Sequence, residues 1–163
     1  MACIQISSNA GVKLYVAAQT NLPTDMAVTN WEAITGTNWV EVSQASSLGA
    51  RGVARQIVEF KGLDGIVCKQ KGSTNYGSMT FEVADIPEDA GQAIMSTAVD
   101  SNLNFPFRIV HDDATATLTS PTTEYFPGMV GTWQMSAASD SDSIRMRSAE
   151  VALNGYVFDA RSA

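Results

Sequence analysis

Alternation of apolar and polar residues is the main pattern of this chain, and it predicts β-strands. The clearest example is residues 79–83, where Met79, Phe81 and Val83 fall on one face and Thr80 and Glu82 on the other. Further strand-like segments occupy residues 12–16, 31–34, 39–42, 53–60, 66–70, 105–110, 114–120, 125–135 and 143–159. About eight to ten strands are expected, which predicts a mainly antiparallel β-sandwich or barrel-like fold.

Several of these strands carry residues that disturb a regular ladder. Pro106 predicts that its segment is an edge strand or the start of a strand, because proline cannot donate to the ladder. Gly128 and Gly131 predict a bend or bulge in the 125–135 strand. The apolar residues of the last segment change face near Ser148, which predicts a second bulge there.

One helix is predicted, over about residues 86–99. Asp85 has the side chain of an N-cap, and Glu88 follows three residues later, which is the spacing of a capping box. Pro87 would lie in the first turn, where its missing N–H costs little. The expected apolar stripe consists of Ile86, Ala90, Ile94 and Ala98.

Length and charge limit what the chain can be. Its 163 residues suffice for one domain with a substantial core. The net charge of −7 argues against sequence-specific nucleic-acid binding, which needs basic groups to neutralise phosphates. Only 17% of the residues are charged, less than in a typical soluble domain, and this suggests a surface partly covered by partners.

Cysteines and hydropathy bear on the cellular compartment. Cys3 and Cys68 lack the spacing of a metal or redox motif, and we expect two free, partly buried thiols. The N-terminus lacks the basic and apolar regions of a signal peptide, and no segment is long and apolar enough to span a membrane. These observations predict a protein made and assembled in the cytoplasm.

No residue pattern predicts catalysis, a cofactor or a metal. The His111-Asp112-Asp113 run could supply ligands or a base, but further ligands are not marked by spacing, and a solvated turn is the simpler interpretation. Asp140 and Asp142 resemble half of a calcium loop without its glycine and glutamate. Nucleophile elbows, phosphate loops and dinucleotide fingerprints are absent from the sequence. We therefore predict that the chain is not an enzyme.

Taken together, the strand, helix and following strand resemble a major tail tube protein of long-tailed bacteriophages, of the siphophage type. The family pattern is a strand, an acidic residue, Gly-Gln at the helix start, small or apolar helix residues, and a strand with aromatic and basic residues. The matching residues here are Phe81, Asp89, Gly91, Gln92, Ile94, Ala98, Phe107 and Arg108. The flanking Trp31…Gly36, Val40-Glu41-Val42 and Pro127-Gly128 also fit, so the resemblance covers about residues 10–160.

The resemblance implies one tail-tube domain over residues 1–163, with two β-sheets or a barrel-like sheet flanked by one helix. Six copies would form a ring, and stacked rings would form the tube that conducts DNA out of the virion without binding it specifically. A long assembly loop at about residues 43–65 would reach the neighbouring ring, which suits the low-complexity segment Ser43–Gly52. The candidate contacts between subunits or rings are Ser46, Ser47, Leu48, Arg51, Arg55, Arg145 and Arg147.

The implied partners are copies of the same chain, together with tape-measure, tail-terminator and distal-tail proteins. The implied location is the virion tail, assembled in the host cytoplasm, with no cofactor. Two other interpretations stay open: a tube subunit of a contractile-injection or type VI secretion system, and a virion decoration or receptor-binding β-sandwich. An enzyme comes last, because no catalytic grouping is present in the sequence.

Overall fold

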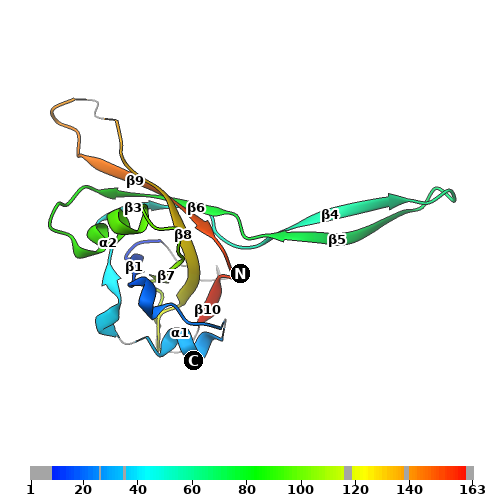
Figure 1. Cartoon of the computed structure of the whole chain (residues 1–163), viewed down its shortest axis with the longest axis horizontal. Helices are drawn as coiled ribbons and strands as arrows, with labels where there is room; N and C mark the ends of the chain where they lie inside the picture. The colour runs from blue at the N-terminus through cyan, green and yellow to red at the C-terminus, as the bar shows by residue number, and fades with distance from the viewer. Residues whose placement is uncertain (1–8, 26, 35, 116–118, 138–139, 161–163) are drawn as a thin grey trace, which may run out of the picture.

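The protein consists of a curved β-sheet body from which a long two-stranded hairpin projects (Figure 1). The computed structural model describes residues 9–25, 27–34, 36–115, 119–137 and 140–160. The elements are β1 (Lys13–Val16), η1 (Gln19–Asn21), α1 (Val28–Glu32), η2 (Gly36–Asn38), β2 (Val40–Glu41), β3 (Ala45–Leu48), β4 (Ala54–Lys61), β5 (Val67–Asn75), β6 (Ser78–Ala84), α2 (Ala90–Ala98), β7 (Phe105–Val110), β8 (Thr123–Met135), β9 (Met146–Leu153) and β10 (Phe158–Ala160).

The main sheet has the strand order β2-β1-β7-β8-β9-β6-β3, with β10 also paired to β8. Every pairing is antiparallel. The thirteen-residue β8 joins the two halves, because its first part pairs with β7 and β10 and its second part pairs with β9. Side chains from both halves meet in one core, so the sheet bends around it like a sandwich. The mainly antiparallel β fold is confirmed, and the described strands do not close into a barrel.

The core contains the alternating residues that the sequence marks. Met79, Phe81 and Val83 are buried on β6, as predicted, and contact the apolar face of β9. The rings of Phe107 and Phe126 stack with their centroids 5.5 Å apart, which joins β7 to β8. Burying side chains of this size stabilises the fold by roughly 2 kcal/mol each.

A second, smaller core lies on the other face of β8. Trp31, Trp39 and Tyr125 are buried there, with Phe158 packed beside them. Trp31 belongs to α1, so the strand predicted at residues 31–34 is wrong. The Asp25 side chain accepts hydrogen bonds from the Ala27 N–H and the Asn30 amide, and such a local cap favours a helical turn over a strand.

The helix α2 is shorter than predicted and begins at a different cap. Asp89, rather than Asp85, is the N-cap, and its Oδ2 accepts a hydrogen bond from the Gln92 N–H at 2.9 Å. The residues predicted before it, including Pro87, form a turn. The predicted stripe is right only in part: Ala98 is buried and Ile94 packs against the core, whereas Ala90 is exposed. The buried face consists of Gly91, Gln92, Met95 and Ala98.

Pro106 and the predicted bulges have mixed outcomes. The strand β7 lies between β1 and β8, so the edge position is wrong, while the strand start is right because β7 begins at Phe105. Pro106 faces Pro127 of β8, and β1 pairs only from Phe107 onward, so no ladder hydrogen bond is lost. A register shift at Gly131 confirms the bulge in β8. The bulge predicted near Ser148 is wrong, since β9 pairs with β6 in continuous register.

The segment 43–65, expected to be a long loop, contains β3 and all of β4. Although Ser43–Gly52 is poor in apolar residues, β3 gains its order by pairing with β6, and Ala45 and Leu48 pack against the core. The expectation of an irregular segment was therefore wrong, because the partner strand supplies what the local sequence lacks. Cys68 is free and exposed on β5, contrary to the expected partial burial, and Cys3 lies outside the described residues.

Candidate assembly surfaces

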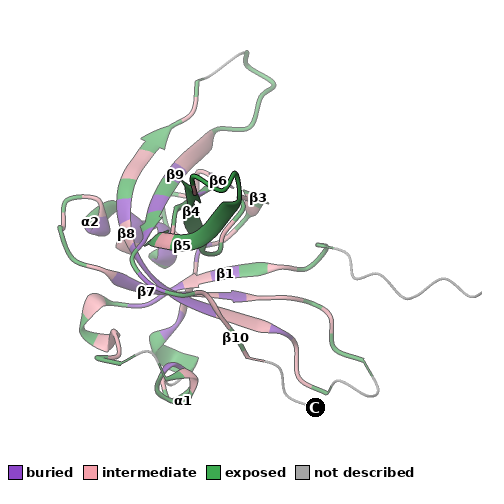
Figure 2. Cartoon of the chain, turned by 90° about the vertical axis from the view of Figure 1, so that its right-hand side faces the viewer, coloured by how far each residue is buried: buried purple, intermediate pink, exposed green. Residues whose placement is uncertain are grey.

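The β4–β5 hairpin is the most exposed part of the molecule. Its strands pair only with each other, and they extend away from the body (Figure 1). Every residue of β4 is exposed, and β5 is exposed throughout except for Gly72 (Figure 2). A two-stranded hairpin with no sheet or helix behind it is marginally stable in water. This hairpin therefore needs another surface to hold it.

The two faces of the hairpin differ in charge. The Glu59–Lys69 and Ile57–Lys71 pairs lie directly opposite each other and so share a face, where the Lys69 ammonium lies 2.9 Å from the Glu59 carboxylate. The opposite face has the Val58–Gln70 and Phe60–Cys68 pairs. The charged face consists of Ile57, Glu59, Lys61, Val67, Lys69 and Lys71, and the uncharged face of Gln56, Val58, Phe60, Cys68, Gln70 and Gly72.

The hairpin tip is rich in exposed apolar side chains. Phe60 is 70% exposed, Ile66 60% and Leu63 fully exposed. The turn between them has Gly65 at φ 82°, and the Asp64 side chain accepts a hydrogen bond from the Ile66 N–H at 3.0 Å. Asp64-Gly65 is a dipeptide that favours such a hairpin turn. Exposed apolar side chains gathered in this way mark an interaction surface.

At the hairpin root, Arg51 is clamped to the body. Both oxygens of Glu124 accept hydrogen bonds from the Arg51 guanidinium, and His111 Nε2 lies 2.8 Å from Oε1 of the same carboxylate. The Arg51 and Glu124 side chains are only 16% and 14% exposed. Burial by itself raises the pKa of Glu124, but the hydrogen bonds and positive charge of Arg51, assisted by His111, outweigh it and lower the pKa.

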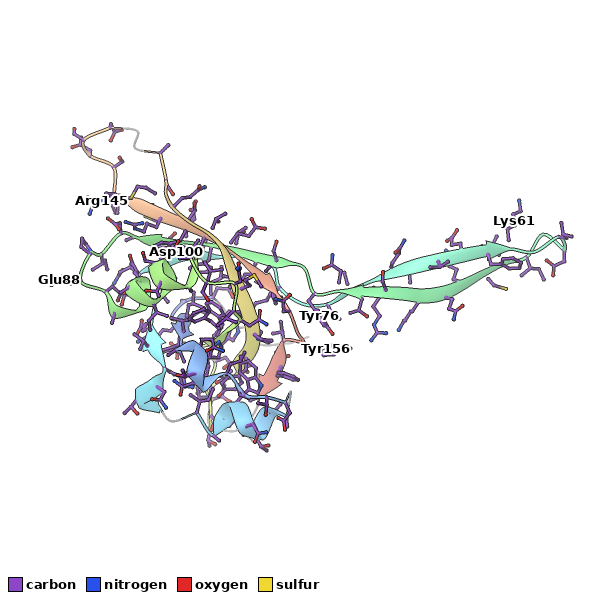
Figure 3. All side chains as sticks on the ribbon, in the orientation of Figure 1. Lys61, Tyr76, Glu88, Asp100, Arg145 and Tyr156 are labelled. Carbon is purple, nitrogen blue, oxygen red and sulfur yellow. The ribbon has the colours of Figure 1, made fainter. Side chains whose placement is uncertain are left out.

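A second contact holds the other strand at the root. Tyr76, just after β5, packs its ring edge-on against Tyr156 with the centroids 5.2 Å apart, and Figure 3 shows the two labelled rings side by side. The Arg55 guanidinium donates a hydrogen bond to the Tyr156 hydroxyl at 3.2 Å. The hairpin is therefore fastened on both of its strands where it leaves the body.

The other two candidate arginines share one carboxylate. Arg145 and Arg147 each bind a different oxygen of Asp85 through Nε, and the Asp85 side chain is only 5% exposed. The pKa of Asp85 is lowered, and the hydrogen bond from Arg147 is the largest cause. Burial of the carboxyl acts in the opposite direction. Arg147 also lies over the Trp133 ring at 5.5 Å, while Arg145 is 59% exposed. Figure 3 shows Arg145 at the start of β9, far from the hairpin.

The outer face of β3, β6, β9 and the second part of β8 is polar, and its described residues include acidic but no basic side chains. The pairs Thr80–Glu150 and Glu82–Ser148 lie on the side opposite to the buried residues of β6 and β9. Ser47, Thr132 and Gln134 extend this face onto β3 and β8. It is bordered by β3, an edge strand of the sheet.

The seven candidate contact residues thus fall into three places. Ser46, Ser47 and Leu48 lie on the edge strand β3, Arg51 and Arg55 at the hairpin root, and Arg145 and Arg147 at Asp85. Sequence reasoning missed the partners Glu124 and Tyr156, for which no spacing signal exists. The strands predicted at 53–60 and 66–70 are confirmed as β4 and β5, but their pairing into an exposed hairpin that projects from the body was not predicted.

The acidic and histidine residues considered for chemistry have structural partners. Besides the His111 contact with Glu124, the Asp113 carboxylate accepts hydrogen bonds from the hydroxyl and N–H of Thr122, and these hydrogen bonds lower its pKa. Asp140 accepts a hydrogen bond from the Asp142 N–H. Within the described ranges, there is no group of three or more potential metal ligands and no helix long and apolar enough to cross a membrane.

Comparison with known proteins gives a consistent result at the level of fold. Neither a protein-family model nor a curated protein matches the chain. Among solved structures, the SPP1 tail tube matches with a TM-score of 0.65 and 12% identity, covering 96% of this chain and 80% of that one. The chain has a tail tube fold.

Two further structures support the same fold. The sheath/tube terminator of the PVC extracellular contractile injection system has a TM-score of 0.67 and 11% identity, covering 98% of this chain and 99% of that one. The tail of an empty gene transfer agent (GTA) particle, refined with C6 symmetry, has a TM-score of 0.63 and 10% identity, covering 97% and 100%. The tail tube fold therefore extends over nearly the whole chain.

Proposed function

We propose that this chain is a structural virion protein that self-assembles into stacked hexameric rings, and that these rings form a phage tail tube that conducts DNA. The observation that carries the proposal is the β4–β5 hairpin, which exposes apolar side chains on a fold that solved tubes share. A hairpin that no other described element covers gains stability when a neighbouring copy covers it.

Charge complementarity favours a second copy as the partner. Between residues 53 and 75 there are four basic residues, Arg55, Lys61, Lys69 and Lys71, and two acidic ones, Glu59 and Asp64, which gives +2. Because the whole chain carries −7, the remainder carries −9. A basic arm and an acidic body attract each other across copies, and opposite charge steers such association.

The geometry of the contact leads to a tube. The hairpin of one copy and the body that receives it are different surfaces, so the contact is heterologous and can repeat without end along an axis. Rings that close sideways would also pair the exposed edges of β3 and β2, which would otherwise invite uncontrolled aggregation. We propose a single domain over residues 1–163. Its inter-ring contact is the β4–β5 hairpin, in place of the loop expected at 43–65.

We assign the polar, acidic face of β6 and β9 to the lumen. Glu82 and Glu150 would repeat around the ring, and a wall with negative charge and no described basic side chain repels the phosphate backbone. DNA would then pass without adhering. This face favours a conduit for nucleic acid over the tube of an injection system that carries protein. Tape-measure, tail-terminator and distal-tail proteins are the further partners we propose, and an enzymatic role is not part of the proposal.

Replacing residues 54–75 by an Asn-Gly turn tests the hairpin directly. We expect the body to remain folded with a nearly unchanged thermal unfolding midpoint, because β4 and β5 pair only with each other and the deletion removes one exposed hydrogen bond to the body, from Arg55 to Tyr156. Electron microscopy should show tubes for the native chain and none for the deletion. Tubes formed by a folded deletion variant would overturn the proposal that the hairpin joins the rings.

A further inference from the structure

We propose that the Arg51–Glu124–His111 cluster is a positioning device that sets the direction of the hairpin and thereby the register between rings. This inference rests on the proposed function, since direction matters only if the hairpin must meet a second copy. Arg51 lies between β3 and β4, so it marks the point where the chain leaves the sheet for the arm. Glu124 lies on β8, the strand that joins both halves of the body.

The geometry of the cluster restricts rotation of the root. A guanidinium that bonds both oxygens of a carboxylate is fixed in plane and in distance, unlike a single hydrogen bond. His111 Nε2 contacts Oε1, the oxygen that also accepts a hydrogen bond from Arg51, so Glu124 has a second partner. The residue that follows Arg51 is Gly52 at φ 142°, a conformation that side chains other than glycine rarely adopt. The backbone at Gly52 does little by itself to restrict rotation of the hairpin, so the Arg51–Glu124–His111 cluster supplies this restriction.

A small change of angle at the hairpin root produces a large displacement of the hairpin tip. The eight residues of β4 span about 26 Å at roughly 3.3 Å per residue, so a tilt of about 10° moves the tip by about 5 Å. That displacement is about one spacing between neighbouring strands. A hairpin tilted that far would present its side chains to the wrong part of the receiving copy. Loss of the Arg51–Glu124–His111 cluster should therefore impair assembly more than its effect on folding stability would indicate.

A pair of variants separates positioning from stability. In Arg51→Met the Glu124 carboxylate loses its main partner while largely buried, so the unfolding midpoint should fall. In the double variant Arg51→Met/Glu124→Leu no buried charge is left, and replacing a buried ion pair by apolar residues is often neutral, so the midpoint should recover. The positioning role predicts that both variants still need at least tenfold more protein to form tubes than the native chain.

Lys13→Met is the matched control, because it removes an ion pair outside the cluster, with Glu41, whose partners on β1 and β2 are 53% and 38% exposed. It should form tubes at the native concentration. If the double variant recovers both stability and native tube formation, the cluster is only structural and the inference fails. Loss of tube formation in Lys13→Met would also contradict it, since any removed ion pair would then have the same effect.

The hairpin direction can be measured without any tube. Spin labels on Cys68 and on a cysteine introduced at the exposed Ser96 of α2, in a Cys3→Ser background, report the distance from arm to body by pulsed electron resonance. We expect a broader or shifted distance distribution in Arg51→Met and in the double variant, and the native distribution in Lys13→Met. Identical distributions in all four proteins would overturn the inference, whether or not the native chain forms tubes.

Discussion

At the scale of single residues, the exposed side chains of the hairpin and the buried ones of the body have separate tasks. Phe60 is 70% exposed and contributes nothing to the core, whereas Phe107 is fully buried. Large aromatic side chains that are exposed on a monomer are the usual energetic centres of an interface. Mutations on the hairpin should therefore affect assembly, and mutations in the core should affect folding.

Phe60→Ser tests this division. Truncating an interface centre costs about 2 kcal/mol, so tube formation should need about 30-fold more protein. The thermal unfolding midpoint should stay nearly unchanged, because the ring is 70% exposed and does not belong to either hydrophobic core of the described residues. Leu103→Ser is the control, since Leu103 is 53% exposed in a loop outside the hairpin. Equal effects of both substitutions on tube sedimentation would contradict a special role for the hairpin.

Acid should weaken the folded chain through Glu124. Its pKa is lowered in the fold from an ordinary value of 4.5, so the unfolded chain binds a proton where the folded chain does not. The stabilisation is present above about pH 4.5 and is lost as the pH falls through the lower pKa of the folded state. Urea unfolding between about pH 5 and pH 3 should show a steeper loss in the native chain than in Arg51→Met/Glu124→Leu. Equal slopes would exclude this contribution.

At the scale of elements, close approach between strands and helix depends on glycine at particular positions. A Cβ on Gly128 of β8 would overlap the Val151 side chain and lie 3.2 Å from the Phe107 ring. A Cβ on Gly91 of α2 would overlap the Glu41 backbone of β2. These glycines let β8 and α2 pack against their neighbours.

Gly128→Ala should therefore destabilise the body by about 1–3 kcal/mol, which is typical of overpacking. Gly36→Ala is the control, because nothing lies within 4 Å of a Cβ at Gly36. Chemical denaturation of both variants measures the difference. If Gly128→Ala unfolds at the native denaturant concentration, the packing of β8 is looser than the structure indicates.

The elements also show what could be predicted from sequence. The strand β6 was predicted correctly because its apolar residues alternate with polar ones and all lie on one buried face. The start of α2 was not predicted correctly, because Asp85 and Asp89 both have side chains suitable for a cap. Asp85 instead pairs with Arg147, which lies far away in the sequence. The arginines could be chosen by residue type, but Glu124 lies 73 residues from Arg51, and no local pattern joins them.

At the scale of the whole molecule, the fold combines a packed body with an arm that no other described element covers. The acidic body, the basic arm and the acidic outer face of β6 and β9 agree with the tube subunit that we propose. The arm is exposed in the monomer (Figure 2), and its apolar side chains lie in water. In the proposed tube, association with further copies would cover that surface.

Electron cryomicroscopy of the purified chain tests this account most directly. We predict hollow tubes of stacked rings, with each hairpin lying on a neighbouring ring and with Glu82 and Glu150 on the inner wall. Monodisperse monomers at every concentration, or tubes in which the hairpins point into solvent, would contradict it.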